Sequence, residues 1–165
     1  MRIILLLMTL LLVAAPALAA PPSWTITGTV TNHTGSPRPL GGHEVKLTAY
    51  VNGAEADWQT VKTSARGEFT FAVPADAQRT YALQVKYKGG EYDSPSIAFK
   101  AGETGKRLTM RVFEPTSDPN VLRVNVHHII VEAGEGMVQV AELLVFANTS
   151  DRTYIGGTPR ADGKR

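Results

Sequence analysis

The sequence contains no cysteine among its 165 residues. Disulfide scaffolds, thiolate zinc sites, cysteine nucleophiles and iron–sulfur clusters are therefore excluded. An excess of charge of one sign is also missing, because 17 Lys and Arg residues stand against 15 Asp and Glu residues and leave a net charge of +2. This balance gives no reason to expect a nucleic acid as partner.

Apolar runs long enough to cross a membrane are absent as well. The longest follows Arg2, extends over residues 3–13 and ends in the small residues of Ala-Pro-Ala-Leu-Ala-Ala. Its apolar core of about a dozen residues is shorter than the roughly 20 of a spanning helix and fits a signal peptide over residues 1–20. We expect cleavage after Ala19 or Ala20, which leaves a chain free in the periplasm or outside the cell and not bound to a membrane. The alternative is that the uncleaved segment tethers the protein.

Helical periodicity is scarce from Trp24 onward, and apolar residues instead recur at every second position. A period of two indicates half-buried strands, separated here by turns rich in Gly, Pro and Asn. The sequence therefore predicts an all-β fold in which seven strands form an antiparallel β-sandwich over residues 21–114. The expected strands are 24–31, 44–51, 57–63, 68–73, 81–87, 97–100 and 108–113.

Four segments follow one another in the order typical of a known family: Gly28–Val30, Pro39–Val45, Gly67–Phe71 and Tyr81–Val85. Their order resembles the carboxypeptidase regulatory-like domain and its relative, the Cna B-type repeat. The resemblance covers about residues 24–114 and implies an Ig/transthyretin-like β-sandwich, usually an accessory, adhesive or spacer module and rarely a catalyst. The chain departs from the family at Asp76–Arg79, where a short Gly-containing turn is common.

A second β unit is predicted after the sandwich. Residues 115–120 are rich in Pro, Ser and Asp and are expected to be a linker. Residues 121–156 alternate as a hairpin that is apolar on both faces, and residues 157–165 have the composition of a disordered polar tail. A lone two-stranded hairpin is marginal in water. Three explanations are considered: the hairpin docks on the sandwich, it pairs with another chain, or it belongs to an incomplete second β unit. The last is favoured, because the basic polar tail has no strand pattern.

Catalytic and metal-binding patterns are missing from the sequence. His127 and His128 are adjacent and point to opposite sides of a strand, and His33 and His43 lack a third ligand at a suitable spacing. The motifs His-Glu-x-x-His and Gly-x-Ser-x-Gly do not occur. We therefore expect no enzymatic activity, no catalytic residues, no metal and no cofactor.

Two groups of residues are candidates for binding. Tyr50 and Trp58 are predicted to be exposed cross-strand neighbours, if the turn between their strands is centred near Ala54, and could stack on a sugar ring. The apolar hairpin supplies a predicted interaction surface of Met137, Leu143, Leu144, Val145 and Phe146. The first hypothesis is thus a non-catalytic exported module for protein interaction, adhesion or structural spacing, including self-association through the hairpin. The alternative is a carbohydrate-binding module whose partner is a cell-surface glycan.

Overall fold

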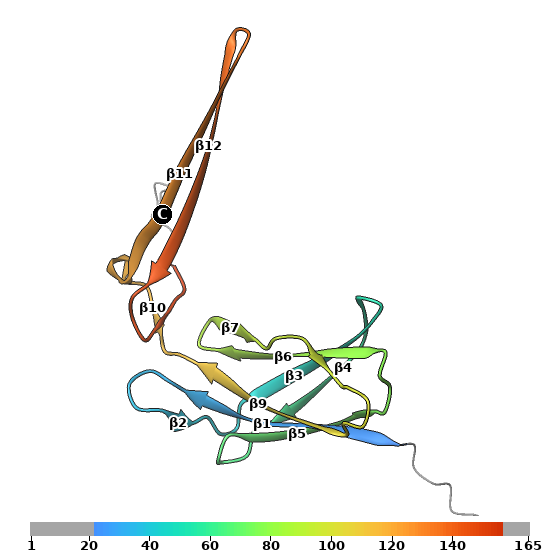
Figure 1. The fold of residues 1–165 in the computed structure, drawn as a ribbon. Helices are drawn as coiled ribbons and strands as arrows, with labels where there is room; N and C mark the ends of the chain where they lie inside the picture. The colour runs from blue at the N-terminus through green and yellow to red at the C-terminus, as the bar shows by residue number, and fades with distance from the viewer. Residues whose placement is uncertain (1–21, 157–165) are drawn as a thin grey trace, which may run out of the picture.

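The structure, a computed structural model, describes residues 22–156 and consists of strands with one short 3-10 turn (Figure 1). Strands β1 to β9 form two sheets that face each other, and a long hairpin of β11 and β12 projects from one end of them. The prediction of an all-β fold is confirmed. The expected signal peptide, residues 1–20, and polar tail, residues 157–165, lie outside the described residues.

The first sheet is built around β1 (Ser23–Asn32), which has neighbours on both edges. Strands β5 (Glu68–Pro74) and β2 (Arg38–Pro39) pair with it in antiparallel fashion, and β9 (Gly105–Val112) pairs with it in parallel. The parallel pair corrects the expectation of an antiparallel arrangement throughout. Alternation along β1 and β9 shows which side of each strand is apolar but carries no information on the direction of a neighbour about 80 residues away.

The second sheet has the order β4-β3-β6-β7, with β8 also on β6. Its strands are β3 (Glu44–Val51), β4 (Ala54–Lys62), β6 (Arg79–Tyr87), β7 (Gly90–Asp93) and β8 (Ile97–Ala98). The sandwich thus contains nine strand segments where seven were expected. The short strands β2 and β8 have two residues each, too few for an alternating pattern, and β7 follows the two-residue turn Lys88-Gly89 without apolar alternation.

The core lies between the two sheets and consists of inward-facing residues of alternating strands. The fully buried residues with the largest side chains are Tyr81, Phe71, Ile26, Leu47 and Leu83. Every second residue of β5 is buried, which is the period-two pattern that predicted this strand. Alternate residues of β6 from Tyr81 to Tyr87 are buried in the same way, so the period of two that predicted these strands is confirmed.

The hairpin between β3 and β4 turns earlier than expected. Val51 pairs with Ala54, so the two-residue turn is Asn52-Gly53, whose φ angles of 52° and 80° lie in the left-handed region. Asn-Gly is the sequence that favours such a tight turn, since both residues tolerate positive φ. The turn is thus not centred near Ala54, the condition under which Tyr50 and Trp58 would be directly opposed, and β4 begins three residues earlier than predicted.

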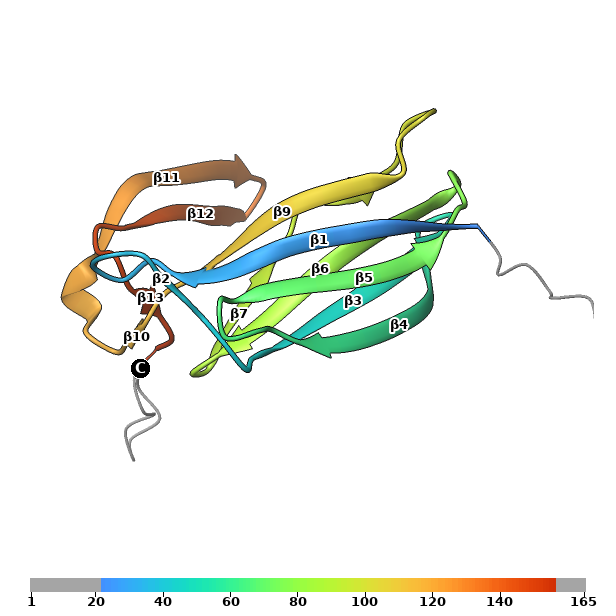
Figure 2. The ribbon, with the colours of Figure 1, turned by 90° about the horizontal axis from the view of Figure 1, so that it is seen from below.

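The C-terminal unit comprises β10 (Pro115–Thr116), a 3-10 turn (Pro119–Val121), β11 (Leu122–Gly134), β12 (Met137–Asn148) and β13 (Thr153–Tyr154). The predicted linker, residues 115–120, is not free of regular structure, because β10 pairs in parallel with β13 and Asp118 caps the 3-10 turn. Strands β11 and β12 rise away from the sandwich in Figure 1, whereas the view from below in Figure 2 looks nearly along the arm and shows the two sheets of the sandwich. Of the three explanations, docking of the hairpin on the sandwich is therefore excluded.

Candidate functional site: a projecting apolar hairpin

We name residues 122–148 the arm. Its two strands pair over their whole length, from Leu122 opposite Asn148 to Gly134 opposite Met137, with one bulge between Val124 and Val126. Side chains of opposed residues lie on the same side of a sheet, so the register sorts the arm into two faces. Face one carries Val124, His127, Ile129, Val131, Val138, Val140, Glu142, Leu144 and Phe146. Face two carries Arg123, Val126, His128, Ile130, Glu132, Met137, Gln139, Ala141, Leu143 and Val145.

Large apolar side chains are exposed on both faces. Eleven of them are open to solvent: Val124, Ile129, Ile130, Val131, Met137, Val138, Val140, Leu143, Leu144, Val145 and Phe146. Their exposed fractions range from 41% at Leu144 to 64% at Val138. Scattered exposed apolar residues are ordinary, whereas a contiguous exposed apolar set of this size is uncommon on a protein without a binding partner. All five predicted interaction residues belong to this set.

Few charges interrupt the arm. On face one, His127 Nε2 lies 3.0 Å from Glu142 Oε2, so the only two titratable residues of that face are partners. On face two, Arg123 and Glu132 stand at opposite ends of β11 and form no ion pair with any other described residue. Strand β11 therefore carries His127 and His128 at its middle, apolar residues on either side of them and opposite charges towards its two ends.

Glu114 anchors the base of the arm to the sandwich. Its side chain receives hydrogen bonds from Lys88 Nζ at 2.6 Å, Tyr87 Oη at 2.6 Å and Asn32 Nδ2 at 2.8 Å. These bonds, with that of Lys88 the strongest cause, lower the pKa of the Glu114 carboxyl to about 2. Arg38 lies 3.3 Å away and adds a second cation. The carboxylate thus joins β1, β6 and the segment that leads into β10.

Tyr92 makes a second attachment. Its hydroxyl donates to the carbonyl of Phe113 at 2.8 Å and accepts from the amide of Phe113 at 3.1 Å. It also lies 2.6 Å from Thr153 Oγ1, which acts as donor because the single phenolic proton is already used. The loop after β1 adds further bonds, since Thr34 Oγ1 and the Gly35 amide both donate to Asp151. Sequence reasoning missed these attachments because their partners are distant along the chain.

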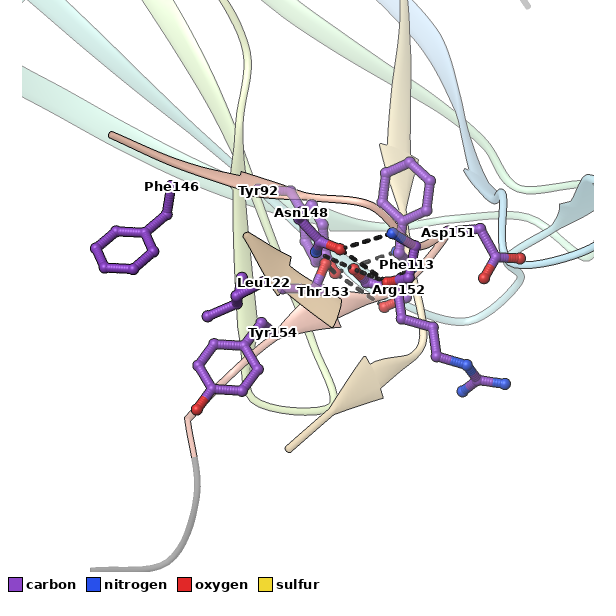
Figure 3. A pocket seen from close by; sticks show the side chains of 10 residues that line it. Tyr92, Phe113, Leu122, Phe146, Asn148, Asp151, Arg152, Thr153 and Tyr154 are labelled. Carbon is purple, nitrogen blue, oxygen red and sulfur yellow. Dashed lines mark hydrogen bonds between the residues drawn. The ribbon is translucent and has the colours of Figure 1, made fainter. Parts of the chain in front are cut away.

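A cleft of about 500 Å³ lies where the arm meets the sandwich (Figure 3). Among its polar groups, the Asn148 side chain accepts from the Ser150 amide and donates to the Arg152 carbonyl at 2.6 Å. Phe113, Leu122 and Phe146 supply the apolar part of its walls, beside Arg152 and Tyr154. The cleft therefore joins the apolar surface of face one to polar side chains at the base of the arm.

Tyr50 and Trp58 lie on the outer face of the second sheet but are not directly opposed. Trp58 pairs with Thr48 and Tyr50 pairs with Glu55, so the two aromatic residues are diagonal neighbours. Trp58 is 58% exposed, whereas Tyr50 is half-buried. The ammonium of Lys46 lies over the Trp58 ring, 5.7 Å from its centroid. One face of the only exposed tryptophan ring is therefore covered by a cation, which reduces the area open for a sugar to stack on it.

The two histidines of the sandwich have an aromatic ring or a hydroxyl group as neighbours. His43 packs edge-on against Tyr87 with ring centroids 5.5 Å apart, and His33 Nε2 lies 3.0 Å from Thr31 Oγ1. Within residues 22–156 no three His, Asp or Glu side chains come together as a metal site. No helix in the same range is long and apolar enough to span a bilayer.

Comparison with known proteins gives only distant likenesses. No family model matches the sequence, and neither does any curated protein. A DUF3823 family protein from Parabacteroides merdae is similar at 11% identity and a TM-score of 0.42, covering 79% of this chain and 83% of that one. The shaft pilin SpaA from Lactobacillus rhamnosus GG is similar at 11% identity and a TM-score of 0.39, covering 86% and 80%.

A lipoxygenase from Cyanothece is similar at 15% identity and a TM-score of 0.40, covering 65% of this chain, which spans only 19% of the length of the enzyme. Likenesses at this level say nothing about function. The class of the protein follows from its own structure: it is an all-β chain in which a β-sandwich carries a projecting apolar hairpin.

Proposed function

We propose that the protein is a non-catalytic, exported interaction module, in which the sandwich is the scaffold and the arm binds another protein chain. The observation that carries this proposal is the set of eleven exposed apolar side chains on a two-stranded hairpin. Burying a Val, Leu, Ile, Phe or Met side chain contributes about 1.5–3 kcal/mol when it is fully exposed beforehand. Because these side chains are about half exposed, their burial against a partner would supply roughly 8–16 kcal/mol before the costs of association.

The attachments at the base of the arm support the same function. Glu114 and Tyr92 tie the arm to the sandwich, so its direction is set before a partner arrives. A surface held in place loses less conformational freedom on binding than a loose segment does. We also propose that the sandwich is a domain of the carboxypeptidase regulatory-like type, because its four sequence segments follow one another in the order typical of that family. The carbohydrate-binding alternative is not favoured, because Lys46 covers the ring of Trp58.

The experiment compares the association of the exported chain with that of Leu144→Asp, which places a charge within face one. Sedimentation velocity over a range of concentrations should show association of the wild-type chain, and Leu144→Asp should reduce it at least tenfold, because a carboxylate must be desolvated at the contact. Thr70→Asp is the matched control, since it adds the same charge at an exposed strand position of the sandwich. A wild-type chain that stays monomeric and binds no apolar dye would contradict the proposal.

A further inference from the structure

The outer edge of β11 is the longest unpaired strand edge of the arm. Strand β11 has 13 residues, and among residues 22–156 β12 is its only neighbour in the sheet. Unpaired backbone groups along such an edge can accept another strand. A two-stranded sheet is marginal in water, whereas three or more strands with an apolar face are stable. The edge therefore favours a partner that supplies at least one more strand.

The charges on this edge match those of a second copy of the same edge. Arg123 and Glu132 lie on the same face, opposite Ala147 and Gln139 of β12. Asn125 is the extra residue of the bulge between Val124 and Val126 and is left out of the pairing. Two copies of β11 can then pair in antiparallel fashion around a two-fold axis at His128. In this register each Arg123 lies opposite the Glu132 of the other copy. Opposite charges in directly opposed positions stabilise a pair of strands.

The same register also matches the apolar residues and uses the whole strand. Ile130 comes to lie opposite Val126 and Val131 opposite Val124, each pair occurring twice because of the symmetry. Leu122, at the start of β11, opposes Ala133, one residue before its end, so nearly the whole strand is paired. An axis at Ile129 would give the same overlap but would place Arg123 opposite Gly134 and Glu132 opposite Val126. The charges therefore select the axis at His128.

The edge of β12 does not offer an equivalent match. Antiparallel pairing of β12 with its own copy over its full length centres on Glu142 or Leu143. The first places two Glu142 carboxylates directly opposite each other, and the second places each Glu142 against Leu144 without a cation. Since like charges in opposed positions destabilise a sheet, β11 is the edge suited to self-pairing.

We propose that two copies of the chain associate through their β11 edges, in antiparallel register around a two-fold axis at His128, to form a continuous four-stranded sheet. This inference rests on the proposed function of the arm and names its partner as a second copy. Such pairing is closed, because each β11 edge is used once, and it leaves faces one and two of the four-stranded sheet open for further contacts.

The first test is a charge exchange. Glu132→Arg places two arginines opposite each other at both ends of the interface and should weaken dimerisation, measured by sedimentation equilibrium, by about tenfold or more. Arg123→Glu should do the same. The double variant Arg123→Glu/Glu132→Arg restores the opposed charges and should return to within about threefold of the wild-type dissociation constant. A double variant weaker than either single variant would overturn the register.

The second test reads the geometry directly. Since the chain has no cysteine, His128→Cys introduces a single thiol on the proposed axis, where the two Cα atoms of opposed residues would be about 4.5–5.5 Å apart. This separation permits a disulfide, so oxidation should give a covalent dimer. Leu143→Cys is the matched control, because Leu143 is opposite His128 on β12 and lies one strand away from the axis. Cross-linking of Leu143→Cys instead of His128→Cys would overturn the proposal.

The two proposals fail in different ways. If Leu144→Asp abolishes association while the charge exchange has no effect and His128→Cys does not cross-link, the arm binds through a face and the β11 register is wrong. If the wild-type chain does not associate at all, both the β11 dimer and self-association through the arm are wrong. Circular dichroism of each variant confirms that the strands are retained.

Discussion

Removing a single oxygen atom from Tyr92 should loosen the attachment of the arm. The Tyr92 hydroxyl makes three hydrogen bonds, at 2.8 and 3.1 Å to the backbone of Phe113 and at 2.6 Å to Thr153. An ordinary hydrogen bond contributes about 0.5–1.5 kcal/mol net. Three bonds give an upper value of about 4.5 kcal/mol, and water can replace part of it because Phe113 and Thr153 are only half-buried. We therefore expect Tyr92→Phe to lower the free energy of unfolding by about 2 kcal/mol.

The assay is equilibrium unfolding in urea, together with hydrogen exchange of the Phe113 and Thr153 amides. Both amides should exchange faster in Tyr92→Phe, since the amide of Phe113 loses its acceptor and the amide of Thr153, which donates to Glu114, lies in the loosened segment. Tyr81→Phe is the matched control, because the Tyr81 hydroxyl makes one long bond of 3.4 Å to Pro74 and should contribute less. Equal losses in the two variants, or unchanged exchange at Phe113, would refute the role assigned to Tyr92.

Two further predictions concern the sandwich. The pKa of Glu114 is lowered in the folded state from 4.5 to about 2, so its carboxylate stabilises the fold above pH 4.5 and this contribution is lost as the pH falls towards 2. The urea midpoints of the wild type and of Glu114→Gln should therefore differ above pH 4.5, and the difference should shrink below it and vanish near pH 2. Gly28→Ala should destabilise the fold by about 1–3 kcal/mol in the same assay, since the added Cβ would lie 2.3 Å from the Leu108 carbonyl oxygen and 2.5 Å from Phe69 Cζ. Gly134→Ala is the control, because the nearest neighbour of its added Cβ would be 3.8 Å away. An equal loss of stability at both positions would contradict the packing explanation.

Alternation of apolar residues was sufficient to predict the long strands. Val45, Leu47 and Ala49 are buried as expected, and so are Phe69, Phe71 and Val73. The same rule could not reveal β2 and β8, which are too short to alternate, or the parallel direction of β9. Strand direction depends on the path of the chain between the partners, and no local pattern records that path.

The candidate site was predictable in its residues but not in its surroundings. The apolar character of both sides of β12 is visible in the sequence, and it predicts a strand buried on both faces. The structure shows such a strand with both faces open, which only the position of the neighbouring elements could reveal. Glu114 gave no signal at all, because its partners Asn32, Tyr87 and Lys88 lie 82, 27 and 26 residues away.

The parallel pairing of β1 with β9 has a mechanical consequence. Eight residue pairs join the two strands, from Thr25 opposite Gly105 to Asn32 opposite Val112. The arm follows β9, so a force that pulls the arm away from Ser23 acts on opposite ends of two parallel strands. The eight pairs are then loaded together in shear and cannot open one after another like a zipper. A partner held by the arm would therefore pull against the part of the sandwich most resistant to stretching.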